Sequence, residues 1–99
     1  MSNSNIKSVQ KTASAAAVAG RTRLLGVYFT NTATASSVVL KDGGASGTAR
    51  LSMLTPAAAG SQDLMIPDMG ILFEDGIYIT LGSAEVTSVT LLFEGGAAA

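Results

Sequence analysis

The sequence of 99 residues contains no histidine, no cysteine and no tryptophan. Without cysteine, the chain can form neither a disulfide framework nor a thiolate metal site. Without histidine or cysteine, a serine or threonine nucleophile would lack its ordinary general base. These absences argue against catalysis, and we expect a non-enzymatic protein that uses no cofactor, no metal ion and no small-molecule substrate.

Charged side chains are also scarce. They make up 13% of the residues, about half of the roughly 25% that is usual in soluble domains. Six basic and seven acidic residues give a net charge of −1. Nucleic-acid binding normally requires clustered Lys and Arg, whereas Arg21 and Arg23, with Lys11 upstream, form the only local group here. We expect no nucleic-acid partner, and a surface with so little charge is typical of one that other proteins cover.

Long hydrophobic runs are missing as well. The alanine-rich segment 12–17 follows Lys7 and Lys11 in the manner of a signal peptide. It lacks the roughly 7 to 15 strongly apolar residues of a secretory sequence. No stretch approaches the roughly 18 continuous apolar residues of a membrane helix. We therefore expect a soluble protein that is made in the cytoplasm and has no membrane partner.

What the chain does have is apolar residues in short runs, 47% of the total, separated by glycine and small polar residues. In segment 22–30, for example, Leu25, Val27 and Phe29 recur at the period of two that is typical of a β-strand. The segments with strand-like composition are 22–30, 37–41, 48–54, 62–66, 71–74, 77–81 and 86–93. Turn signals recur at roughly 8 to 12 residues. We predict an all-β fold, a single small antiparallel β-sandwich or jelly-roll-like barrel of seven to eight strands.

The turns contain glycine, proline and small polar residues. The glycine-rich segment 42–47 predicts a hairpin with a long loop between strands 37–41 and 48–54. Asp75-Gly76 is a strong signal for a two-residue turn. The glycine segments lack the Gly-Lys-Ser or Gly-Lys-Thr ending of a phosphate-binding P-loop. We interpret them as hairpin and tail glycines.

Residues 1–20 fit three structures. Ile6, Val9 and the alanine run could form an eighth strand, a weak helix, or an arm that lies on a neighbour. The predicted organisation is an N-terminal arm or edge strand over 1–20, a β-sandwich domain over 21–94 and a flexible tail over 95–99. The arm would extend from the sandwich toward a partner.

Candidate site residues are few. Glu74 and Asp75 are adjacent carboxylates, but carboxylates in loops are normally solvated or cap turns, so we expect neither a catalytic pair nor a cation site. Methionines near one central corner either fill gaps in a small core or form an adaptable contact patch. The two tyrosines lie on the polar-facing side of their strands and mark either an interface or cross-strand pairs. The candidate protein-interface residues are Ile6, Val9, Val18, Tyr28, Met65, Met69 and Tyr78.

Several segments together resemble the small virion structural proteins of tailed bacteriophages, of the short head or tail accessory type found in phages of aquatic bacteria. The segments are 23–30 (RLLGVYFT), 37–48 (SVVLKDGGASGT), 70–73 (GILF) and 77–81 (IYITL). The resemblance spans roughly residues 21 to 93 and rests on strands and turns, without a signature site. It implies a capsid decoration, or cement, protein in the virion, which binds the outside of the shell and stabilises contacts between major capsid proteins. A homo-oligomer is expected, with a trimer favoured.

Two other functions remain open. The same module could be a neck, tail or fibre-attachment subunit, which copy number per particle would distinguish from a cement protein. A carbohydrate-binding β-sandwich would usually present aromatic platforms, and two tyrosines without tryptophan supply few.

Overall fold

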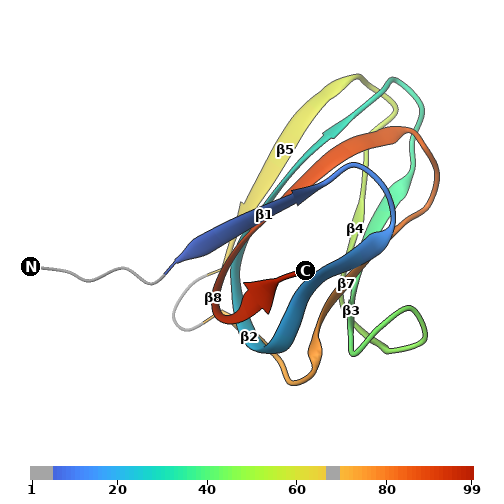
Figure 1. Ribbon diagram of the computed structural model, residues 1–99. Coiled ribbons are helices and arrows are strands. Elements are labelled where there is room, and N and C mark those ends of the chain that lie inside the picture. Colours follow the sequence, from blue (N-terminus) through green and yellow to red (C-terminus); the bar gives the residue numbers. More distant parts are fainter. Residues whose placement is uncertain (1–5, 67–69) are drawn as a thin grey trace, which may run out of the picture.

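The computed structural model describes residues 6–66 and 70–99, which form eight β-strands and no helix (Figure 1). The strands are β1 (Lys7–Lys11), β2 (Ala15–Asn31), β3 (Ser37–Asp42), β4 (Thr48–Leu54), β5 (Gly60–Met65), β6 (Ile71–Phe73), β7 (Gly76–Leu81) and β8 (Val86–Ala98). All of their pairings are antiparallel. The prediction of an all-β, antiparallel fold with seven to eight strands is confirmed. None of the described segments forms a helix able to span a lipid bilayer.

Two long strands, β2 and β8, take part in both layers of the sandwich. The first half of β2 pairs with β7, and its second half pairs with β6 and β5. Strand β8 follows the opposite side of β2 along most of its length. One layer, called the β7 layer, consists of β4, β3, β7, the first half of β2 and the end of β8. The β5 layer is made by β1, the first part of β8, the second half of β2, β6 and β5.

Both long strands bend where they pass from one layer to the other (Figure 1). The pairing register shifts between Ala19 and Thr22 of β2, opposite Gly95 and Gly96 of β8. Both glycines have positive φ, at 79° and 54°, a conformation that other residues rarely adopt. A Cβ at Gly96 would also overlap the hydroxyl of Thr22. The bend therefore depends on glycine at this position.

The core lies between the layers and is built from alternate residues of the strands. Its buried apolar side chains are Ala17, Val18, Leu24, Val27, Phe29, Val38, Leu40, Phe73, Ile77, Ile79, Val86, Val89, Leu91 and Phe93. Val38 and Leu40 of β3 both belong to this core. A register shift between Leu24 and Gly26 changes the expected alternation in β2. A bulge inserts one residue, so Leu24 faces the core and Leu25 is only half-buried.

The C-terminal prediction is wrong, because residues 95–98 continue β8 instead of forming a flexible tail. Ala97 and Ala98 pair with β2, and the amide of Ala99 donates to the carbonyl of Ala17 at 2.9 Å. Two lysines of β1 bind this segment from the side. The Nζ atom of Lys7 donates to the Gly96 carbonyl at 3.1 Å, and that of Lys11 to the Ala99 carbonyl at 2.8 Å. The backbone pairing with β2 and the two lysine hydrogen bonds hold residues 95–99 in place, although this segment consists only of glycine and alanine.

The N-terminal region contains strand and no helix among its described residues. Residues 7–11 form β1, which pairs with residues 89–93 of β8. Residues 15–20 belong to β2. The boundary expected after residue 20 therefore falls inside a strand.

The predicted hairpin is present, since β3 pairs with β4 along its length. The turn at Asp75-Gly76 does not close a second hairpin. Strand β6 pairs with Thr22–Leu24 of β2, whereas β7 pairs with β3 and with the other half of β2. This turn therefore carries the chain from the β5 layer to the β7 layer.

Candidate functional site

The exposed apolar side chains that meet on one surface lie on the outer face of the β5 layer. Met65 of β5 and Leu92 of β8 flank Gly26 of β2 in the pairing register. In the next row, Tyr28 lies between Asp63 and Thr90. Met65 is 62% exposed and Tyr28 is 45% exposed.

Gly26 shapes the centre of this face. A Cβ built there would lie 2.9 Å from the Sδ atom of Met65 and 3.3 Å from the Cδ1 atom of Leu92. These two side chains therefore lie over the bare backbone of Gly26. An isolated glycine within a strand often marks such a close approach. We call the outward-facing residues Gly26, Tyr28, Met65, Leu72 and Leu92 the outer face.

Next to Leu72 the outer face is hollowed. The hollow has a volume of about 270 Å³ and is lined by Arg21, Thr22, Arg23, Leu72, Glu94 and Gly95. Arg23 pairs in register with Leu72 of β6 and with Glu94 of β8. The sequence singled out Arg21 and Arg23 as a local basic group, but gave no sign of the wall that β6 and β8 build beside them.

The other candidate interface residues lie elsewhere. Val18 is only 3% exposed and belongs to the core, so it is not available at the surface of the domain. Val9 of β1 is half-buried against the core. Tyr78 is half-buried in the β7 layer, and Ile6, 51% exposed, precedes β1. Met69 lies outside the described residues.

Two strands present a free edge beside exposed apolar residues. Within residues 6–66 and 70–99, strand β4 pairs only with β3, and its last residue, Leu54, is 80% exposed. Over the same residues, strand β5 pairs only with β2, and all six of its residues are exposed. Edge strands of this kind can add a strand from a partner.

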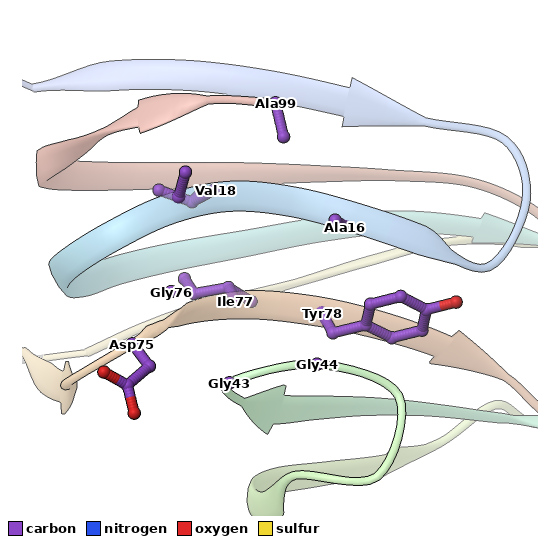
Figure 2. Close-up of a pocket in the computed structure, with 10 residues that line it drawn as sticks. Ala16, Val18, Gly43, Gly44, Asp75, Gly76, Ile77, Tyr78 and Ala99 are labelled. Carbon is purple, nitrogen blue, oxygen red and sulfur yellow. The ribbon is translucent and has the colours of Figure 1, made fainter.

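A second hollow, of about 180 Å³, lies between β2, β7 and the loop after β3 (Figure 2). Small residues and backbone make most of its wall. Figure 2 shows the ring of Tyr78 and the carboxylate of Asp75 at opposite ends of it. These groups do not converge on a common point, so the hollow does not assemble an acid-base pair. Among the described residues, no group of three or more His, Cys, Asp or Glu side chains could hold a metal ion.

One carboxylate does have an organised set of partners. The Asp42 carboxylate accepts hydrogen bonds from the backbone amides of Asp75 at 2.8 Å and Glu74 at 3.0 Å. It also forms an ion pair with Arg50 at 3.1 Å. Desolvation raises the pKa of Asp42, but these donors outweigh it and hold the pKa below the ordinary value of 3.8. Asp42 thus fastens the turn between β6 and β7 to the hairpin of β3 and β4, which is a structural task.

Comparisons with known proteins give no relative from which a function could be transferred. No protein-family model, no curated protein sequence and no solved structure matches the chain. The candidate functional surface is therefore the outer face together with the adjacent free edge of β5.

Proposed function

We propose that this protein is a non-enzymatic structural protein of a bacteriophage virion, a capsid decoration protein. It binds the outside of the shell and stabilises contacts between major capsid proteins, as a homo-oligomer for which a trimer is the expected order. The observation that carries the proposal is the outer face of the β5 layer, where Met65 and Tyr28 are exposed beside a free edge strand. The resemblance of the sequence to phage virion proteins supplies the kind of partner.

The outer face has the chemistry of a protein contact. Aromatic residues and methionine are enriched in protein interfaces, whereas lysine, glutamate and aspartate are depleted there. The thioether of Met65 can adapt to an irregular partner surface. Because Gly26 has no side chain, the side chains of Met65 and Leu92 lie over its backbone and form the centre of the face.

A small domain can stabilise a shell when many copies of it bind. A contact of standard size buries roughly 800 Å² on each partner, a modest area for one copy. A subunit that bridges two or three capsid proteins makes its later contacts effectively intramolecular, which strengthens the whole assembly. We therefore expect stabilisation of the shell to come from many equivalent contacts.

The carbohydrate-binding alternative is less well supported. The three phenylalanines of the chain are buried in the core. Tyr28 lies in the β5 layer and Tyr78 in the β7 layer. These two rings therefore do not form one platform against which a sugar could stack.

The test is the copy number of the protein in purified virions, measured by quantitative mass spectrometry against the major capsid protein. A ratio near one, or near one-third, supports a cement protein that covers the shell. A dozen copies or fewer per particle would favour the neck, tail or fibre-attachment alternative. Absence of the protein from virions would contradict the whole proposal. A matched binding assay adds the purified protein to expanded capsids that lack it, where saturable binding is expected.

A further inference from the structure

The basic residues of the chain differ in whether they already have a partner. Four of the six bind within the domain: Lys7 to the Gly96 carbonyl, Lys11 to the Ala99 carbonyl, Lys41 to the Ala45 carbonyl and Arg50 to the Asp42 carboxylate. The guanidinium groups of Arg21 and Arg23 have no hydrogen bond or ion pair within residues 6–66 and 70–99. The two guanidinium groups that have no partner in this part of the chain thus lie two residues apart on β2.

Local structure turns both arginines outward into the same hollow. Thr22, between them, is 1% exposed, and its hydroxyl donates to the Gly20 carbonyl at 2.8 Å. Leu24, which follows Arg23, is also buried. Since neighbours of inward-facing strand residues point to the opposite side, Arg21 and Arg23 both line the hollow beside Leu72.

We propose that this hollow binds a carboxylate of an acidic side chain on the partner protein. The proposal rests on the proposed function, because it assigns a specific contact to the face that meets the shell. A guanidinium group matches a carboxylate through two parallel hydrogen bonds. Leu72, one of the outer-face residues, gives the hollow an apolar wall. A protein segment with one acidic residue among apolar ones therefore fits it.

The charge of the site favours one carboxylate over a polyanion. Glu94 lines the same hollow as the two arginines, so the three side chains carry a net charge of +1. The whole chain has a net charge of −1. Nucleic acid requires several basic groups along a phosphate backbone, and Glu94 would repel that backbone.

The direct test is an NMR titration of the ¹⁵N-labelled protein. The probes are a capped acidic peptide, Gly-Asp-Leu-Gly, and its neutral counterpart, Gly-Asn-Leu-Gly. The acidic peptide should shift the arginine side-chain signals and the amides of Thr22 and Gly95, with weaker binding at high salt. The R21Q/R23Q variant should lose these shifts, whereas K41Q should keep them, because Lys41 is committed to its own loop.

Three outcomes would overturn the proposal. They are equal shifts with the neutral peptide, no shifts with the acidic one, or tighter binding of an oligothymidine, which would assign the hollow to a polyanion. Both substituted arginine side chains lie at the surface, and a melting curve for each variant verifies that it is folded. If the double variant does not fold, the single variant R21Q takes its place.

Capsid binding separates this proposal from the proposed function. If wild-type protein binds capsids, R21Q/R23Q should bind about tenfold more weakly, and K41Q should bind like the wild type. Unchanged capsid binding by R21Q/R23Q would refute the carboxylate site and leave the decoration function intact. If the wild-type protein binds the acidic peptide but does not bind capsids, the carboxylate site is supported and the decoration function is refuted.

Discussion

Strands β2 and β8 take part in both the corner and the outer face of the molecule, yet glycine has a different role in each. At the corner, where β2 and β8 bend, the space next to Gly95 and Gly96 is filled by backbone atoms of β2 and by the side chains of Thr22 and Val18. On the outer face, the space next to Gly26 is filled by the flexible end of Met65 and by Leu92. The corner therefore fixes the fold, whereas the outer face leaves exposed side chains that can adapt to a partner.

Gly76→Ala, at the start of β7 where it pairs with Ala19 beside the corner, should have the largest effect on stability. Gly76 has a φ of 104°, which other residues rarely adopt, and a Cβ there would overlap the carbonyl oxygen of Val18. Because a backbone atom of the adjacent strand cannot rotate away, we expect a loss of about 3 kcal/mol in the free energy of unfolding. Urea denaturation followed by circular dichroism measures it. A loss below about 0.5 kcal/mol would show that the corner tolerates rearrangement.

Asp42→Asn should have the next largest effect, by loosening the turn that joins the two layers. The side-chain oxygen of the introduced asparagine can still accept a hydrogen bond, but the substitution leaves Arg50 without a charged partner. It also places an NH₂ group near the backbone donors of Glu74 and Asp75. We expect a loss of about 1 to 2 kcal/mol at neutral pH. The control is Asp63→Asn, since the Asp63 carboxylate has no hydrogen-bond partner in the described part of the chain.

The pH dependence of unfolding gives a second measurement for Asp42. Its pKa is lowered in the folded protein, so its contribution is fully present above the ordinary value of 3.8 and is lost as pH falls through the folded pKa. The stability difference between wild type and Asp42→Asn should therefore shrink below about pH 4. A difference that stays constant down to pH 2 would mean that the carboxylate charge does not matter.

Sequence reasoning reached most of the fold because strand composition and turn residues are local signals. The strand and hairpin positions between residues 37 and 54 follow directly from them. Two features escaped because they depend on contacts between distant segments. The segment 95–99 has almost no side chains, so only its pairing with β2 reveals a strand. The bulge next to Gly26 shifts the alternation by one residue, which periodicity alone does not show.

The candidate site was harder to predict than the fold. Tyr28 could be proposed from the alternation of its strand and Met65 from the adaptability of methionine, and the structure places both on one face. Val18 could not be separated from surface residues, because an alanine-rich sequence has no clear alternation around it. The hollow beside Arg21 and Arg23 needs β6 and β8 next to β2, a long-range arrangement that the sequence does not encode locally.

Met65→Ser tests the outer face without touching the corner. Because the side chain is 62% exposed, we expect the free energy of unfolding to change by no more than about 0.5 kcal/mol. Capsid affinity should fall several-fold, measured by co-sedimentation with shells that lack the protein. The matched control is Leu54→Ser, which removes an exposed apolar side chain from β4, in the other layer. Equal losses for both variants would contradict a specific role for the outer face.

Gly26→Ala gives the closest comparison with Gly76→Ala and should have the smallest effect on stability. Its φ is not in the positive range, and the nearest atom is the Sδ of Met65, which can rotate away. We expect a change within about 0.5 kcal/mol. The displaced Met65 should still weaken capsid binding. In a Met65→Ser background the same alanine should then have little further effect on affinity, because the side chain that it displaces is already gone. Additive losses of affinity would instead mean that the partner touches the Gly26 backbone itself.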